Sequence, residues 1–201
     1  MIKQCQQIFN KLLTTEYVFV LGRKGQSETI VLNFDTTDFY HIVGLQYLED
    51  LPQLQGARDR VYQRLKDGAT LLDAVRKSPH YNKIVQERMT PFLKIVSLLE
   101  SDNLVFRFNR RAARHSVFSR LRFDYMFEAT DPESGKTICI FLRRRSDEDN
   151  QYTLTTIFYK GHIDFSAGNT HWIVLKTDRI DNLNGTVENL YTRPSYQATS
   201  R

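Results

Sequence analysis

The sequence has little cysteine and no long apolar run. Its two cysteines, Cys5 and Cys139, lie far apart and form no CxxC pair, so neither a disulfide framework nor a structural zinc site is expected. No run of about 18 apolar residues occurs, and lysine and glutamine interrupt the first residues, so neither a membrane span nor a signal peptide is predicted. We therefore expect a protein of the cytoplasm with no membrane partner.

Acidic residues are fewer than basic ones. The 201 residues include 28 Lys and Arg against 23 Asp and Glu, which gives a formal net charge of +5. Such an excess favours polyanionic partners through long-range attraction and counterion release, although many basic proteins bind no nucleic acid. With 41% apolar residues, the chain can bury a sizeable core. We expect a single domain over residues 1–201.

Helical and strand-like segments separate along the chain. The spacing of apolar residues predicts helices over most of residues 1–101, interrupted by a hairpin of two β-branched and aromatic segments, 17–21 and 28–34. Strand-like segments joined by polar turns fill residues 102–192, and the tail 193–201 looks frayed. We predict an α+β fold in which the N-terminal helices and the hairpin pack on a C-terminal antiparallel sheet.

The most suggestive histidine is His41. A helix is predicted from a cap at Thr36 or Thr37 to about Leu48, which places His41 on the same face as Leu45 and predicts its partial burial. Such a histidine is either a core residue with one hydrogen-bond partner or a general acid or base whose pKa is moved by its neighbours. The pattern alone favours the first interpretation.

The strongest compositional signal is the run of arginines in residues 106–122. This segment reads FRFNRRAARHSVFSRLR and contains no acidic residue. Guanidinium groups bind phosphate in a bidentate manner and aromatic faces stack on unpaired bases, so RNA is the expected partner. The alternative is a solvated loop whose aromatic residues belong to the core. The arginines expected to contact RNA are Arg107, Arg110, Arg111 and Arg114.

Two further signals are weaker. Glycines at both ends of residues 22–25 would allow a phosphate-binding loop, but the spacing of a P-loop is missing, so a hairpin tip carrying Arg23 and Lys24 is the better interpretation.

His162 and Asp164 would share one face of a strand, either as a histidine held by a carboxylate or as two metal ligands. Two ligands do not make a site, and no dense ligand array occurs, so we expect no metal and no cofactor.

Several short stretches carry a resemblance to a known family. Residues 20–26 read VLGRKGQ, residues 30–34 read IVLNF and residues 38–48 read DFYHIVGLQYL. The later order of segments is also similar, including TTIFYK at residues 155–160. Over most of residues 17–176 the chain resembles the fourth phage-associated nuclease family related to barnase, EndoU, colicins and RelE.

The resemblance implies a metal-independent endoribonuclease, often a toxin or effector of phages and mobile elements, with an immunity or antitoxin protein as a further partner. In this chemistry a base removes the proton of the RNA 2′-hydroxyl, cations stabilise the phosphorane, and an acid protonates the leaving 5′ oxygen. We assign His41 and His171 to proton transfer, Arg23, Lys24 and Lys160 to the phosphate, and Thr170 to positioning a phosphate oxygen.

Two other functions stay open. One is a non-catalytic RNA- or protein-binding module on a decayed nuclease fold, and the other is a metal-dependent DNA nuclease that uses His162 and Asp164. Cleavage of RNA in EDTA distinguishes the ribonuclease from both. For RNA binding, we expect charge reversal within residues 107–122 to weaken affinity more than the same change at Arg58 or Arg60, which we place on a helix surface.

Overall fold

The protein is described by a computed structural model, in which residues 1–101, 103–109, 121–146 and 150–196 are placed. Helix α1 (Ile2–Leu12) leads into a hairpin of strands β1 (Thr15–Arg23) and β2 (Gln26–Leu32). The helices that follow are α2 (Asp38–Ile42), α3 (Arg58–Asp67), α4 (Ala69–Lys77), α5 (Gln86–Phe92) and α6 (Ile95–Leu99), with the short helical turns η1 (Leu45–Tyr47), η2 (Pro52–Leu54) and η3 (Tyr81–Val85) between them.

The strands of the second half are rich in β-branched and aromatic residues, which suit a pleated and partly buried surface. They are β3 (Leu104–Arg107), β4 (Tyr125–Thr130), β5 (Thr137–Arg144), β6 (Gln151–Tyr159), β7 (Thr170–Asp181) and β8 (Thr186–Thr192).

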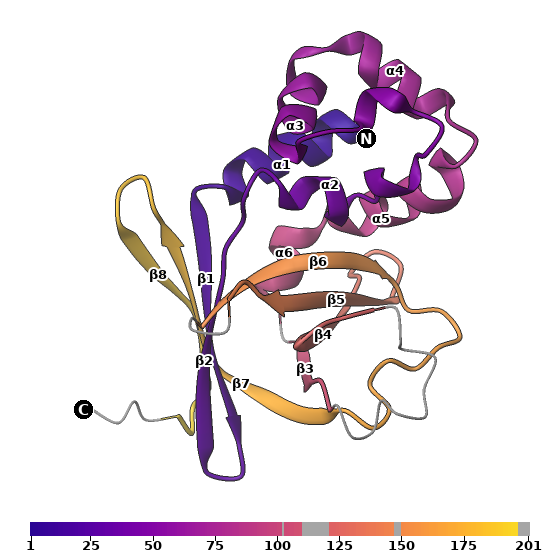
Figure 1. Cartoon of the computed structure of the whole chain (residues 1–201). Coiled ribbons are helices and arrows are strands. Elements are labelled where there is room, and N and C mark those ends of the chain that lie inside the picture. Colours follow the sequence, from indigo (N-terminus) through magenta and orange to yellow (C-terminus); the bar gives the residue numbers. More distant parts are fainter. Residues whose placement is uncertain (102, 110–120, 147–149, 197–201) are drawn as a thin grey trace.

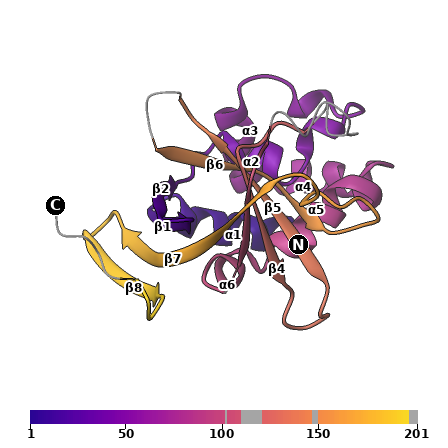
Figure 2. The ribbon, with the colours of Figure 1, turned by 90° about the horizontal axis from the view of Figure 1, so that it is seen from below.

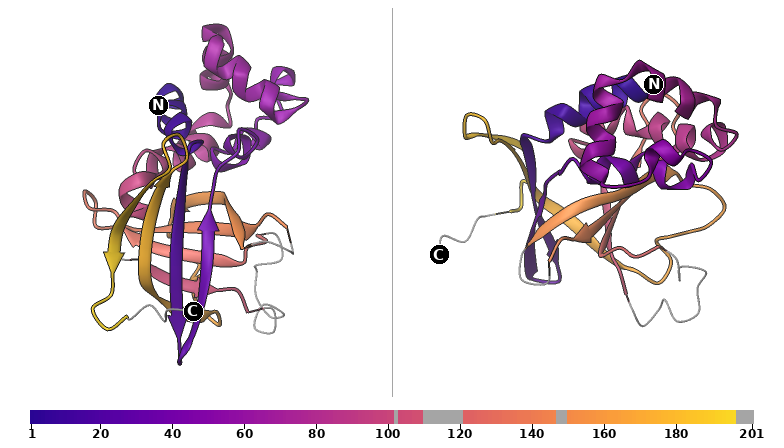
Figure 3. Two further views of the ribbon diagram at one scale, coloured as in Figure 1. Left: turned by 90° about the vertical axis from the view of Figure 1, so that its left-hand side faces the viewer. Right: turned by 45° about the horizontal axis from the view of Figure 1, so that its top comes forward.

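The strands form a barrel. In the described residues, eight strands make one sheet in the order β1-β2-β6-β5-β4-β3-β7-β8, and β1 also pairs with β7. This additional pairing closes the strands from β1 to β7 into a ring, while β8 is attached to β7 outside it. The neighbours are antiparallel, except that β2 pairs with β6 in parallel. Figure 3 shows β8, β7, β1 and β2 side by side, with β6, β5 and β4 crossing behind them.

The predicted α+β arrangement is therefore wrong. The N-terminal hairpin does not pack on a separate antiparallel sheet; it belongs to the sheet and closes it, and the sheet is mixed. Closure is possible because β7, with 12 residues, pairs with β3 through its first residues and with β1 through most of the others. The alternation of apolar residues in a sequence indicates which face of a strand is buried, but not which distant strand lies beside it.

The helices gather at one end of the barrel, above the strands in Figure 1, and the view from below in Figure 2 shows the strands from the other side. One hydrophobic core runs from the helices into the barrel and includes Phe9 of α1 and Phe39 of α2 together with Phe19 and Phe127 of the barrel wall. None of the helices in the described part of the chain is both long and apolar enough to cross a membrane.

The helix that carries His41 is shorter than predicted. Helix α2 ends at Ile42, because Gly44 follows with φ +79°, a left-handed conformation that ends helices. Thr37 is the N-cap residue, one of the two predicted, but its side chain makes no capping hydrogen bond. Its backbone N–H and its hydroxyl both donate to Asp35 Oδ1 instead, at 2.9 and 2.7 Å. The glycine therefore sets the end of the helix, and Asp35 holds its start.

Phe9 offers a test of how the N-terminal helices pack together. Its ring is fully buried and contacts the rings of Phe34, Phe39, Tyr62 and Phe92. We expect Phe9→Ala to lower the free energy of unfolding by about 3–5 kcal/mol, because the cavity left among these rings cannot collapse fully. Urea unfolding followed by circular dichroism measures this change.

The matched control is Leu183→Ala, at a site where the leucine is 78% exposed. It should change the free energy of unfolding by less than about 0.5 kcal/mol. Equal effects of the two substitutions would contradict a core that is centred on the Phe9 ring.

Candidate functional site

Five side chains converge on the inner face of the barrel, one from each of the strands β2 to β6. We call them the inner cluster: Glu28, Arg107, Tyr125, Arg144 and Tyr152. Each lies two positions from a buried apolar residue of its strand and therefore on the same face, so its side chain points into the barrel. Polar groups on a face that is otherwise apolar are costly unless they are paired, which makes this cluster the first candidate for a site.

Glu28 lies between two guanidinium groups. Its Oε2 is 2.9 Å from Arg107 Nη1, and its Oε1 is 3.9 Å from Arg144 Nη2. Arg144 also donates through Nε and Nη2 to the hydroxyl of Tyr152, at 3.2 and 2.9 Å. The side chain of Glu28 keeps 21% of its surface exposed and that of Arg107 keeps 46%. The carboxylate and both cations are therefore within reach of a ligand.

Two tyrosines lie beside these charges. The rings of Tyr125 and Tyr152 meet edge to face with their centroids 5.5 Å apart. Burial, and then the neighbouring Glu28, raise the pKa of Tyr125. Burial also raises the pKa of Tyr152, with a partial offset from Arg144. Both phenols are therefore protonated at neutral pH, so that each can donate a hydrogen bond.

A cavity of about 530 Å³ opens at the inner cluster, and its lining includes four members of the cluster and Asp124. Beside it, the Tyr125 hydroxyl and the indole Nε1 of Trp172 are buried, and neither makes a well-aligned hydrogen bond to a described residue. The guanidinium of Arg107 lies 5.9 Å from the centre of the Trp172 ring. Buried donors are nearly always satisfied, so the Tyr125 hydroxyl in the cavity wall indicates a place for a ligand or water.

A second cavity, of about 650 Å³, adjoins the first. We call it the arginine pocket. Its lining includes His41 of α2, Tyr47 of η1 and six arginines, which are Arg58, Arg88, Arg122, Arg143, Arg144 and Arg145. The last three also line the cavity of the inner cluster. The two cavities therefore meet along the end of β5.

His41 is half-buried at the edge of the arginine pocket, as the helical pattern predicted. Burial, followed by the positive charge of Arg58, lowers the pKa of His41, and Asp38 acts in the opposite direction. The imidazole is therefore neutral at neutral pH and able to accept a proton.

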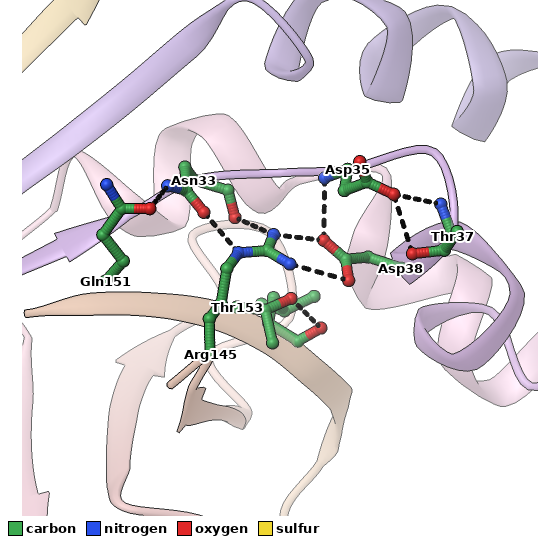
Figure 4. A network of polar contacts seen from close by, with 8 residues as sticks. Asn33, Asp35, Thr37, Asp38, Arg145, Gln151 and Thr153 are labelled. Atoms are coloured by element: carbon green, nitrogen blue, oxygen red, sulfur yellow. Dashed lines mark hydrogen bonds and ion pairs between the residues drawn. The ribbon is translucent and has the colours of Figure 1, made fainter. Parts of the chain in front are cut away.

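Arg145 ties the strand that ends at this pocket to the segment that carries His41. Its guanidinium pairs with Asp38 and donates to the backbone oxygen of Asn33 at 3.0 Å, while the Asp35 backbone N–H donates to Asp38 at 2.8 Å (Figure 4). The hydrogen bonds from Thr37 hold the pKa of Asp35 below its ordinary value. These contacts fix the start of α2 against the end of β5, and so they position His41.

The structure brings only some of the predicted site residues together. Thr170 is the cross-strand partner of Arg107 and therefore shares the inner face with it. His171 pairs with Phe106 instead and lies exposed on the outer face, with the two rings 5.4 Å apart. His41 and His171 thus line no common cavity among those described. Lys160 is held by Glu128 at 2.7 Å, with Asp164 at 3.0 Å, so its charge is balanced.

The other predicted positions lie apart from both cavities or outside the description. Arg23 and Lys24 are exposed at the tip of the β1–β2 hairpin. Arg110, Arg111 and Arg114 lie outside the described residues, as does most of the arginine run. In the described residues, no three His, Cys, Asp or Glu side chains come together as ligands for a metal ion.

Sequence reasoning missed Glu28, Tyr125 and Tyr152. It placed Arg58 on a helix surface, and Arg58 is indeed exposed at the start of α3, but the sequence did not show that it borders the arginine pocket. Glu28 did carry a signal. It lies in β2 on the same face as the buried Ile30 and Leu32, and a carboxylate on such a face is rare unless it is paired. The tyrosines carried none, because aromatic residues are common in any buried strand.

A carboxylate held between two arginines of a cavity wall, next to a pocket of further arginines, has the groups that a phosphodiester would need, since guanidinium groups bind phosphate oxygens and a carboxylate transfers protons. Residues 1–193 match the family described as phage-Barnase-EndoU-ColicinE5/D-RelE like nuclease4, PBECR4. The chain belongs to this family of phage-associated nucleases, and the resemblance seen in its motifs is confirmed. No curated protein and no solved structure is detectably similar to it.

The lowered pKa of His41 predicts how stability depends on pH. Below pH 6.5, the ordinary pKa of histidine, the unfolded chain takes up a proton at this residue more readily than the folded one. The stability contributed by neutral His41 is therefore present above pH 6.5 and is lost as the pH falls through its folded pKa. In His41→Gln, urea unfolding at a series of pH values should show a shallower dependence over this range.

The control for this measurement is His162→Gln, in an exposed loop. It should keep the dependence of the unmodified protein. A variant at position 41 that loses stability with falling pH as steeply as the control would show that His41 is not held neutral by the fold.

Proposed function

We propose that the protein is a metal-independent endoribonuclease that cleaves RNA through attack of the 2′-hydroxyl on the adjacent phosphate. The observation that carries this proposal is the partly exposed Glu28 carboxylate between Arg107 and Arg144, two arginines that line an open cavity. Membership of a nuclease family supports the cleavage of a phosphodiester. RNA suits such a site, because it carries its own nucleophile, the 2′-hydroxyl, whose proton a carboxylate base can take.

Glu28 is the proposed general base. A carboxylate that keeps 21% of its surface exposed can take the proton of a 2′-hydroxyl placed in the cavity. The oxygen then attacks phosphorus and the bond to the 5′ oxygen breaks, which leaves a 2′,3′-cyclic phosphate. Arg107 and Arg144, already aligned on Glu28, supply the positive charge that stabilises the pentacoordinate phosphorane.

Tyr125 is the proposed donor to the leaving 5′ oxygen. Its raised pKa keeps the phenol protonated at neutral pH, and its hydroxyl has no well-aligned partner among the described residues. An alkoxide leaving group is more basic than a phenolate, so transfer of the phenol proton to it is favourable. Thr170, on the same inner face as Arg107, is placed to contact a phosphate oxygen.

The assignment of proton transfer to His41 and His171 remains a distinct version of the same reaction. It has less support, because His171 lies on the outer face of β7 while His41 lines the arginine pocket. Variants separate the two versions. If Glu28 is the base, loss of Glu28 lowers activity and loss of His171 does not; if the histidines transfer the protons, the pattern is reversed.

The decisive experiment incubates the pure protein with labelled RNA in EDTA and examines the ends of the products. Wild type should produce 2′,3′-cyclic phosphate ends. Glu28→Gln keeps the shape of the side chain but removes the base, and it should lower kcat/KM by about 10²–10⁴-fold. His171→Ala should keep activity close to that of wild type.

Glu16→Gln is the matched control, because Glu16 lies on neighbouring β1 and outside both cavities. Its activity should equal that of wild type. If Glu28→Gln cleaves RNA as fast as this control while His41→Ala and His171→Ala are inactive, the two-histidine version replaces the carboxylate version. If wild type leaves RNA intact in EDTA and also with added divalent metal, the enzyme proposal fails.

The alternative is a non-catalytic RNA-binding module. The pairing of Glu28 with Arg107 at 2.9 Å favours it, because such an ion pair is also what a purely structural contact between two strands looks like. Tight RNA binding by wild type without any cleavage, retained in Glu28→Gln, would select this function.

The role in the cell belongs to the same proposal. We propose a phage or mobile-element toxin that acts in the cytoplasm, where its buried free thiols, Cys5 and Cys139, stay reduced, and that is restrained by an immunity or antitoxin protein. Expression in bacteria should arrest growth, and Glu28→Gln should relieve the arrest. Equal toxicity of the two proteins would contradict a role based on cleavage.

A further inference from the structure

The inner cluster accounts for the scissile phosphate, but the arginine pocket beside it contains positive charge that this chemistry does not use. We propose that the arginine pocket binds the RNA strand next to the scissile bond, taking one further phosphate and one unpaired base. The inference rests on the proposed function and names its substrate class: single-stranded RNA that extends beyond the two nucleotides joined by the scissile bond.

The first support is uncompensated charge. Of the six arginines in the lining, Arg144 and Arg145 have carboxylate partners, namely Glu28 and Asp38. The other four have no carboxylate within ion-pair distance in the part of the chain that the structure describes: Arg58, Arg88, Arg122 and Arg143. Unpaired guanidinium groups around one cavity repel one another, and a phosphate relieves this repulsion.

The second support is an aromatic platform in the same pocket. Tyr47 is 42% exposed, and the guanidinium of Arg88 lies 4.7 Å from the centre of its ring. The side chain of Arg88 packs against the backbone of Gly44. A Cβ at that position would lie 3.0 Å from Arg88 Cδ, so the glycine leaves room for the arginine. An exposed ring beside a planar cation is the surface on which unpaired bases stack.

The third support is a pair of unsatisfied polar atoms. The hydroxyl of Thr156 and Oε1 of Gln46 are buried, both residues line the pocket, and neither atom has a hydrogen-bond partner in the described residues. Thr156 itself is only 5% exposed. One hydroxyl and one amide oxygen can satisfy the donors and acceptors of a base edge, whereas a phosphate alone would leave the amide oxygen unsatisfied.

The path between the two sites follows from their shared lining. Arg143, Arg144 and Arg145 border both cavities, so a strand bound at the inner cluster runs into the arginine pocket along a row of guanidinium groups. A base that stacks on Tyr47 must be free of a pairing partner. The geometry therefore points to a single strand rather than a duplex.

The experiment compares two substrates, a mixture of dinucleotides and a single-stranded RNA of about twelve nucleotides. In wild type, the longer RNA should have the higher kcat/KM. In the double variant Arg58→Gln/Arg88→Gln, and separately in Tyr47→Ala, this advantage should shrink about tenfold, the size expected for one lost stacking or phosphate contact. The control Arg60→Gln/Lys66→Gln removes the same charge from exposed positions of α3 and should retain the advantage.

Affinity gives a readout that does not depend on catalysis. A 2′-O-methyl RNA of the same length lacks the nucleophile, and its binding is measured by fluorescence anisotropy at several salt concentrations. The pocket variants should bind about tenfold more weakly than the control, and the double variant should lower the slope of log K against log salt by about 1.

The outcomes separate the two proposals. If wild type cleaves neither substrate but the pocket variants lose affinity relative to the control, the ribonuclease proposal fails while the binding pocket stands. If RNA is cleaved and the pocket and control variants agree in both readouts, the pocket inference is overturned and the ribonuclease stands. Binding of duplex RNA as tight as that of the single strand would overturn the stacked base.

Discussion

The pairing of β1 with β7 is the constraint on which the site depends. It builds the N-terminal hairpin into the sheet, and only in that arrangement does β2 place Glu28 between guanidinium groups that come from β3 and β5. The same closure encloses the inner face, so that the charges lie beside aromatic rings rather than in open water. Electrostatic interactions are stronger in such surroundings than in solvent. The barrel therefore brings the charged groups together and also strengthens the interactions between them.

The polar interior is a cost that the rest of the fold must offset. Unsatisfied donors on Tyr125 and Trp172 favour the unfolded chain, in which water would satisfy them. The continuous core that joins the helices to the barrel supplies the opposing free energy, with Phe9 and Phe92 among its fully buried rings. The helices at one end of the barrel thus serve the site indirectly, by stabilising a ring whose own interior is partly polar.

The sequence predicted the kinds of residues better than their arrangement. The hairpin around residues 22–25 and the half-buried position of His41 followed from local patterns, because turn residues and helical spacing act over a few positions. The barrel did not follow, since the parallel pairing of β2 with β6 joins segments more than a hundred residues apart. Glu28 was missed for the same reason, as its importance comes from Arg107 and Arg144, which only the closed ring brings near.

The two cavities differ in charge, and this difference suggests that one positions the reacting groups while the other supplies affinity for the substrate. In the inner cluster each cation faces a carboxylate, so the cluster attracts a polyanion weakly but holds its groups in fixed positions. In the arginine pocket four arginines have no carboxylate partner among the described residues, so the pocket attracts phosphate strongly without orienting any reacting atom. An enzyme that acts on a long polyanion gains from this separation. Under the proposed function, charge needed for affinity stays out of the inner cluster, where it would bind the substrate and the transition state equally and add nothing to the rate of the chemical step.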